Sequence, residues 1–192
     1  MEGIDAATVA QVLSGDESAF RALGERHSRR LFRLAFRMTN NEQDAEDVVQ
    51  EAFLRAYRQL GQFQSRSNFS TWLYRIGMNC AVDLMRSKRK HTERRQVLDD
   101  AEGADAVLNL PDEKPTPDRL TLSKEIQSKI GQALSSMGEK ERAAFVLRHF
   151  EGMSIEEVGD ILGLGESAAK NSIFRAVQKL RRELQPMVNE VL

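Results

Sequence analysis

Apolar residues recur every three or four positions along most of the chain, which is the spacing of helices with one buried face. This spacing predicts a short helix over residues 8–13 and a longer one over residues 16–38. The inward positions of the longer helix are Phe20, Leu23, Leu31, Leu34, Ala35 and Met38. A turn at residues 39–41 leads to a third helix, whose apolar stripe is Val49, Ala52, Phe53, Ala56 and Leu60. No segment alternates like a β-strand, so the pattern predicts an all-α fold.

The segment from Phe69 to Lys90 changes from aromatic to basic along its length. It begins with Phe69, Trp72, Leu73 and Ile76 and ends with Arg86, Lys88, Arg89 and Lys90. Basic residues that follow aromatic ones suit melted nucleic acid, because bases stack on rings and phosphates pair with cations. The alternative is a packed core followed by a charged helix end. We favour the core for the aromatic part and an anionic partner for the basic part, whose like charges repel one another.

The third predicted helix also carries a polar patch. Asp47, Gln50 and Glu51 are spaced i, i+3 and i+4, which gathers two carboxylates and an amide on one side, away from the apolar stripe. Such a patch is a candidate functional surface. The alternative is an ordinary solvated helix face.

The composition changes between residues 92 and 122. Acidic residues accompany three of the four prolines of the chain, which are Pro111, Pro115 and Pro117. Such a composition is typical of an extended linker. The sequence therefore predicts two small helical domains, over residues 8–92 and 123–190, joined by an acidic, proline-containing linker over residues 93–122.

Helical spacing resumes after the linker. Two helices are predicted over residues 123–134 and 139–150, the second with its apolar positions at Ala143, Val146, Leu147 and Phe150. Ser154 and Glu157 form a capping box at the start of another helix. A tight turn at residues 163–165 then leads to a last helix over residues 166–184. Two helices with so short a turn predict a helix-turn-helix, which places its second helix in the DNA major groove; the alternative is an ordinary helical hairpin.

Charge and composition narrow the function. The chain has 28 Lys and Arg against 29 Asp and Glu, so its net charge indicates no particular partner. Cys80 is the only cysteine, and the three histidines lack ligand-spaced partners, so we expect no metal site and interpret each histidine as an ordinary polar residue. No phosphate loop or nucleophile motif is present, and we expect neither an enzyme nor a cofactor nor a small-molecule substrate. Without a signal peptide or membrane span, the protein is expected in the cytoplasm, with no membrane insertion.

Two segments resemble a known family. The residues Asp-Ala-Glu-Asp-Val-Val-Gln-Glu at 44–51, Phe-Ser-Thr-Trp-Leu-Tyr-Arg-Ile at 69–76, and Asn79, Asp83 and Arg86 resemble the second conserved domain of the extracytoplasmic-function group of sigma-70-type initiation factors. The helix-turn-helix at the other end resembles the fourth conserved domain of the same group. The resemblance implies a sigma factor that directs core RNA polymerase to promoters.

The resemblance also implies roles for single residues. Asp47, Gln50 and Glu51 match positions that dock on the basic coiled coil of the polymerase β′ subunit. Asn79 matches the position that reads a base of the −10 element, and residues 62–68 match the loop that receives an extruded base. Phosphate contacts in the −10 region are expected from Arg86, Lys88, Arg89 and Lys90. Contacts with the −35 element are expected from Lys170, Asn171, Phe174 and Arg175. Further implied partners are the β subunit, promoter DNA and an anti-sigma factor.

The predicted recognition helix departs from the pattern of the group. Ala168, Ser172 and Val177 replace a hydroxyl and two arginines that the group commonly carries. We therefore expect loose binding of the −35 element, which Ser172→Arg should tighten.

Two other functions fit parts of the sequence. A helix-turn-helix regulator that never engages polymerase has no need of Asp47, Gln50 and Glu51 together with Trp72 and Asn79. A helical adaptor that binds only protein leaves the basic residues from Arg86 to Lys90 unexplained.

Overall fold

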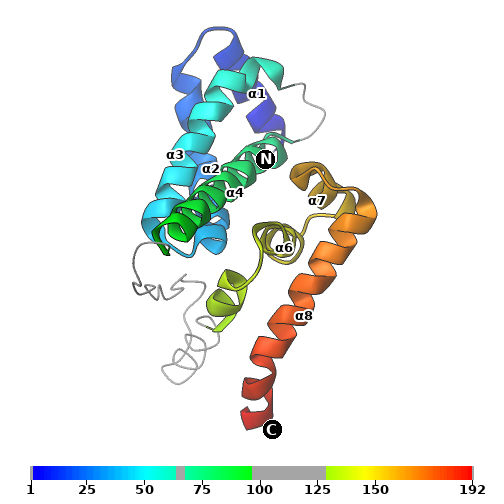
Figure 1. The fold of residues 1–192 in the computed structure, drawn as a ribbon. Coiled ribbons are helices and arrows are strands. Elements are labelled where there is room, and N and C mark those ends of the chain that lie inside the picture. Colours follow the sequence, from blue (N-terminus) through cyan, green and yellow to red (C-terminus); the bar gives the residue numbers. More distant parts are fainter. Residues whose placement is uncertain (1, 64–67, 97–128, 192) are drawn as a thin grey trace. The chain divides into compact units, whose positions relative to one another are not determined.

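The computed structural model describes residues 2–63, 68–96 and 129–191 of the chain (Figure 1). Every regular element within these ranges is a helix, which confirms the predicted all-α fold. The linker predicted over residues 93–122 falls largely outside them, and so do residues 64–67 of the predicted base-receiving loop. The chain divides into two compact units, Met1–Leu84 and Met85–Leu192.

In the first unit, α1 (Glu2–Leu13) packs on α2 (Ser18–Thr39), and α2 packs along α3 (Glu42–Gln59). The 3₁₀ turn η1 (Leu60–Gln62) follows α3, and α4 (Phe69–Gln96) then crosses α2 and α3 (Figure 1). Helix α1 begins well before the predicted residue 8. The reason is polar: Asp5 and Thr8 both bind the guanidinium of Arg26 on α2, which ties the first turns of α1 to the rest of the unit.

Polar residues mark the start and the end of α2 and the start of α3. The Asp16 carboxylate accepts hydrogen bonds from the hydroxyl and the backbone N–H of Ser18, and these bonds lower the pKa of Asp16. Helix α2 ends at Thr39 and is followed by Asn40, whose φ of 54° is a left-handed conformation that asparagine tolerates. The Asn41 side chain then caps α3 by accepting a hydrogen bond from the backbone N–H of Asp44 at 2.9 Å.

The core of the first unit joins the apolar faces of α2, α3 and α4. Its fully buried large side chains include Leu23, Leu31, Leu34, Met38, Leu73 and Met78. On α3 the buried positions are Ala45, Val48, Ala52 and Ala56, whereas the predicted Val49 and Phe53 are only half-buried. Gly77 allows α4 to lie close to both neighbours. A Cβ atom at Gly77 would lie 2.5 Å from Leu31 Cδ1 and 3.8 Å from Ala52 Cβ.

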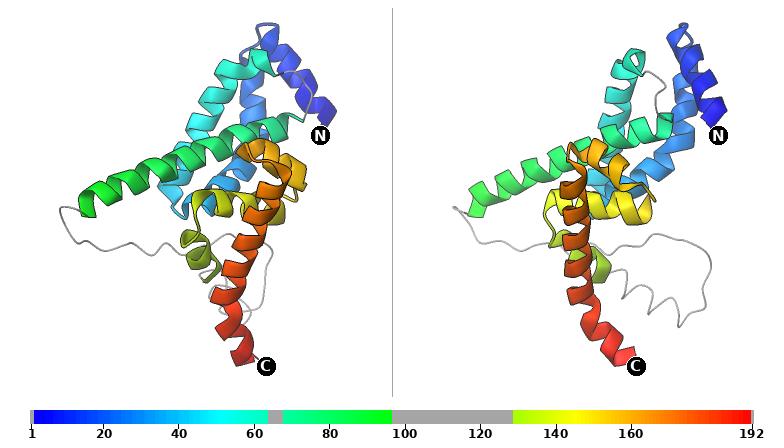
Figure 2. Two further views of the ribbon diagram at one scale, coloured as in Figure 1. Left: turned by 45° about the vertical axis from the view of Figure 1, so that its right-hand side comes forward. Right: turned by 90° about the vertical axis from the view of Figure 1, so that its right-hand side faces the viewer.

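The second unit holds the end of α4, a short helix over residues 129–135, α6 (Glu139–Phe145), the π-helical turn η2 (Val146–Phe150), α7 (Ile155–Leu162) and α8 (Glu166–Val191). Figure 2 shows α8 as one long helix, against which α6 and α7 pack. Its core includes Leu134, Met137, Phe145 and Ala176, with Ile130, Val177 and Leu180 packed on them. The inward position predicted for Phe150 is wrong. This side chain is 41% exposed, because the wider π-helical turn shifts its angular position.

Candidate functional site

The polar patch on α3 lies on the surface, as its spacing predicts. Asp47 and Gln50 are exposed, and Glu51 is half-buried. Among the described residues Asp47 has no ion pair, whereas Glu51 Oε1 pairs with Arg55 Nε at 2.6 Å. This hydrogen bond is the main cause that raises the pKa of Arg55 above its ordinary value. The patch thus presents one free carboxylate and one that an internal cation already holds.

An exposed leucine lies beside this patch. Leu54 follows Gln50 and Glu51 by one helical turn and is 52% exposed. Sequence analysis did not identify it, although its position outside the apolar stripe of α3 was a usable signal. Apolar side chains of this kind are frequent at the centres of docking surfaces.

The aromatic residues at the start of α4 form a compact cluster. The ring centroids of Phe63, Phe69 and Trp72 are 5.2–5.9 Å apart. Phe69 is 3% exposed and Leu73 is fully buried, but Trp72 is only half-buried. The core assignment is therefore confirmed for Leu73 and Ile76, while Trp72 is buried only in part.

Asn79 lies on an exposed stripe that runs along α4. At roughly 100° per residue, one side of the helix carries Arg75, Asn79, Asp83, Arg86 and Lys90, all of them exposed. Within the described parts of the chain, the Asn79 side chain makes no hydrogen bond. Lys88 is rotated by roughly 180° from Asn79 and so does not share this stripe. The structure thus brings Asn79, Arg86 and Lys90 together, but not Lys88. Arg89 is exposed beside the stripe, and its Nη1 lies 2.9 Å from Glu139 Oε1.

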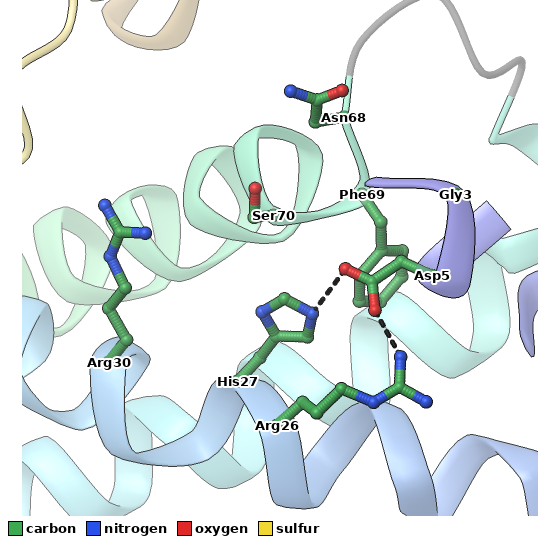
Figure 3. Close-up of a pocket in the computed structure, with 8 residues that line it drawn as sticks. All are labelled: Gly3, Asp5, Arg26, His27, Arg30, Asn68, Phe69 and Ser70. Atoms are coloured by element: carbon green, nitrogen blue, oxygen red, sulfur yellow. Dashed lines mark hydrogen bonds and ion pairs between the residues drawn. The ribbon is translucent and has the colours of Figure 1, made fainter. Parts of the chain in front are cut away.

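A cavity of about 610 Å³ lies between the starts of α1 and α4 and the middle of α2 (Figure 3). On one side of it the Asp5 carboxylate pairs with Arg26 and with His27 Nε2, the latter at 2.9 Å. Asp5 and His27 are both buried. The Arg30 guanidinium lies 5.2 Å from the centre of the Tyr74 ring, where a cation–π contact forms. Sequence spacing gave no signal for this cluster, because Asp5 and His27 come from different helices.

The helix-turn-helix is built as the sequence predicts. The Ser154 N–H donates to Glu157 Oε2 at 2.7 Å, and the Glu157 N–H donates to Ser154 Oγ at 3.1 Å, which confirms the capping box. Gly163 ends α7 with a φ of 62°, a left-handed conformation that favours glycine. The Leu164 N–H then bonds the Gly159 carbonyl oxygen at 2.8 Å, and α8 starts at Glu166.

The start of α8 presents the four predicted −35 residues on its exposed side. Lys170, Asn171, Phe174 and Arg175 are all exposed, and Phe174 reaches 62%. Acidic neighbours hold the two cations. Lys170 Nζ lies 2.7 Å from Glu166 Oε1, and Arg175 Nε lies 3.5 Å from Glu141 Oε1 of α6. Glu141 also binds Lys179 Nζ at 2.6 Å, so one carboxylate of α6 holds two cations of α8.

The prediction about Ser172 is wrong. Ser172 is 5% exposed and Val177 packs on the core of the second unit, so an arginine at either position would not reach a bound partner from the exposed side. Only Ala168 of the three departures is exposed. The expectation of loose −35 binding rested on three residues, and Ser172 and Val177 no longer count as evidence for it.

Comparisons with known proteins agree with this arrangement. Residues 23–91 match the model of sigma-70 region 2, and residues 127–180 match that of sigma-70 region 4. The RNA polymerase sigma-H factor of Pseudomonas aeruginosa is 35% identical over 187 residues, which are 97% of this chain and 96% of that protein. The ECF RNA polymerase sigma factor SigW of Bacillus subtilis is 31% identical over 93% of this chain and 96% of its own.

The chain belongs to the extracytoplasmic-function (ECF) group of sigma factors. It directs transcription initiation, and its family does not consist of enzymes. The ECF fold is also that of the sigma factor RpoE, solved in complex with the anti-sigma factor NepR from Bartonella quintana. That structure matches 86% of this chain and 96% of its own with a TM-score of 0.67 and 22% identity. Among the described residues of this ECF factor, no helix is both long and apolar enough to cross a membrane.

Proposed function

We propose that α3 and α4 dock this sigma factor on core RNA polymerase and read the −10 element, while α8 reads the −35 element. The observation that carries the proposal is the stripe on α4, where Asn79 and several cations share one exposed side. An amide can read a base edge, and the cations on either side of it can bind phosphates. Sequence-specific binding of DNA needs both kinds of contact. A regulator that binds DNA only through a helix-turn-helix would have no use for this stripe.

Docking is assigned to Asp47, Gln50 and Glu51, which face the basic coiled coil of the β′ subunit. Opposite charges steer the encounter and fix its orientation, so a free carboxylate at Asp47 suits this role. Leu54 adds apolar area at the edge of the same face, where desolvation stabilises the complex.

Reading of the −10 element is assigned to Asn79, with Arg86, Arg89 and Lys90 on the phosphates. Lys88 would contact the backbone from the other side of α4. The loop over residues 62–68, next to the half-buried Trp72, would receive an extruded base. Extrusion costs a few kcal/mol of stacking, so sequences that melt easily are favoured and recognition assists strand opening.

Reading of the −35 element is assigned to Lys170, Asn171, Phe174 and Arg175 at the start of α8. In a helix-turn-helix, the first turns of the second helix contact base edges in the major groove. Glu166 and Glu141 hold two of these cations in the free protein, and phosphates would compete with these carboxylates when DNA binds.

The two domains are assigned to residues 8–92 and 123–190, with a linker over residues 93–122 that would lie in the β and β′ channels. We place the protein in the cytoplasm, where its polymerase and promoters are found. An anti-sigma factor is a further partner, because the RpoE structure of the same fold contains one. Such a partner would cover the α4 stripe and the start of α8.

The proposal is tested by run-off transcription with purified core polymerase on fragmented genomic DNA, followed by sequencing of the RNA 5′ ends. The expected result is a set of start sites that share −10 and −35 sequences and require the protein. Start sites that do not change when the protein is omitted would contradict the proposal. Polymerase with an Asn79→Ala variant serves as the matched reaction, because its start sites should still depend on the protein but should share a different base in the −10 element.

A further inference from the structure

One cation lies between the two surfaces assigned to α3 and α4. Arg55 Nε is 2.6 Å from Glu51 Oε1, and Arg55 Nη1 is 3.6 Å from Asp83 Oδ2. Glu51 belongs to the docking face of α3, and Asp83 belongs to the exposed stripe of α4. The side chain of Arg55 is 37% exposed, so its guanidinium is partly shielded from solvent. A single guanidinium is therefore shared by carboxylates with different proposed partners.

Asp83 is out of place in a surface that binds phosphates. It lies one turn after Asn79 and just before Arg86, and it is the acidic member of a stripe otherwise made of cations and an amide. An uncompensated carboxylate there would repel the backbone of the strand that Asn79 reads. Arg55 offsets this charge from the neighbouring helix without occupying the stripe itself.

The packing of α3 against α4 places Arg55 near Asp83. Ala52, one turn before Arg55, lies beside Gly77, where a Cβ would meet the Ala52 Cβ at 3.8 Å. The absence of a side chain at Gly77 thus lets α4 pack against α3 at this point. Arg55 and Asp83 follow this contact on their respective helices, so their pairing depends on the buried contact as well as on flexible surface side chains.

We propose that Arg55 is a positioning residue that neutralises Asp83 on the −10-reading surface and couples this surface to polymerase docking at Glu51. The inference rests on the proposed function of the two faces. When a cation of polymerase pairs with Glu51, the charge of Arg55 is left to Asp83 alone, and the stripe repels phosphates less. Because coupling is reciprocal, DNA bound at the stripe strengthens docking by the same factor.

The test uses holoenzyme reconstituted from the full chain and core polymerase. The probe is a fluorescent single-stranded oligonucleotide that carries the −10 sequence found by run-off mapping. Arg55→Gln should weaken its binding about two- to fivefold, which is the size expected for a partly exposed ion pair. Adding Asp83→Asn to Arg55→Gln should restore the affinity, because the carboxylate that needed neutralising is gone. Arg58→Gln is the matched control, since Arg58 is exposed on the same helix and has no ion pair among the described residues.

Coupling is measured separately as the ratio of core polymerase affinities with and without the oligonucleotide. Arg55→Gln should lower this ratio about two- to fivefold, and Arg58→Gln should leave it unchanged. A loss of DNA binding that Asp83→Asn does not restore would overturn the inference, because a merely structural role predicts no rescue. An unchanged coupling ratio would overturn it as well. A different result would contradict the proposed function itself, namely transcription start sites that are the same with and without the protein.

Discussion

Gly159 of α7 lies directly against the backbone carbonyl of Leu164, so a Cβ atom at this glycine would be 2.8 Å from that oxygen. The same two residues are joined by the hydrogen bond that closes the turn of the helix-turn-helix. The position of the recognition helix therefore depends on the absence of one side chain.

Gly159→Ala should destabilise the second unit and weaken binding of −35 DNA. A backbone oxygen cannot move aside cheaply, and overpacking of this kind typically costs about 1–3 kcal/mol. Gly24→Ala is the control, because nothing lies within 4 Å of a Cβ at that helical position and alanine should stabilise α2 by about 1 kcal/mol. Chemical denaturation of both variants gives the comparison. A stabilised Gly159→Ala protein would show that helix propensity outweighs the close contact.

Asp47→Lys combined with Glu51→Lys should abolish co-purification with core polymerase. Both side chains are at the surface, so the helical circular-dichroism signal should stay that of the wild type. Loss of that signal would mean that the carboxylates support the fold, and retained polymerase binding would reject the docking assignment. Glu46→Lys is a suitable control, since this exposed carboxylate lies next to Asp47 but on another side of α3.

Asn79→Ala should change which base is accepted in the −10 element while leaving affinity for core polymerase unchanged. A contact that reads one base is typically worth about 1–3 kcal/mol. Transcription from a set of promoters that differ at each −10 position measures the effect. An equal loss at every promoter would show that Asn79 does not read a base.

Glu141→Gln should tighten binding of −35 DNA and steepen its salt dependence. The carboxylate holds Arg175 and Lys179 in the free protein, so its removal makes both cations available to phosphates. The slope of log K against log salt should grow by about one unit for each added phosphate contact. Glu156→Gln removes the same charge from α7 without freeing a cation, since Glu156 has no ion pair in the described chain. Weaker binding by Glu141→Gln would mean that Glu141 orients Arg175 for DNA.

Ser172→Arg should destabilise the second unit by about 1–3 kcal/mol, since a charged side chain would replace a buried hydroxyl. Ala168→Arg, at an exposed position one turn earlier, should leave the unfolding free energy nearly unchanged. A denaturant titration of both variants separates the two positions. Equal stability of both proteins would show that an arginine at residue 172 can turn outward.

Much of the fold was predictable because the amphipathic pattern and the capping residues agree. The spacing of apolar residues placed α2 and α3, and the Ser154–Glu157 box marked the start of α7. The start of α1 was missed, because the interactions that hold it are polar and join residues from different helices. On α3 the sequence pattern predicted that Val49 is buried, whereas the structure buries Val48. The helices that pack on α3 decide which of these adjacent valines is buried, and the pattern of a single helix does not contain that information.

The residues of the candidate site could be predicted from the sequence, but the ion pairs that join them to other helices could not. Helical spacing identified Asp47, the family resemblance identified Asn79 and Lys170, and all three lie at the surface. The ion pairs between helices were not predictable, because Arg55 meets Asp83 on α4 and Glu141 meets Arg175 on α8. Arg142 shows the same limit. It is 3% exposed, and burial lowers its pKa to about 10, although an arginine at this position gives no sequence signal for burial.

The ion pairs of Asp5 with Arg26 and His27 hold α1 on α2, and they bear on how readily α1 opens locally. Helix α1 contributes Val9 to the buried apolar surface, while Ile4 and Leu13 remain largely exposed, so few apolar contacts hold it. Its amide protons should therefore exchange with solvent as one group, faster than those of α2, because segments with few buried contacts open locally at low free energy. Opening would uncover His27 and Phe69, whose ring centroids are 5.4 Å apart, and would loosen the start of α4.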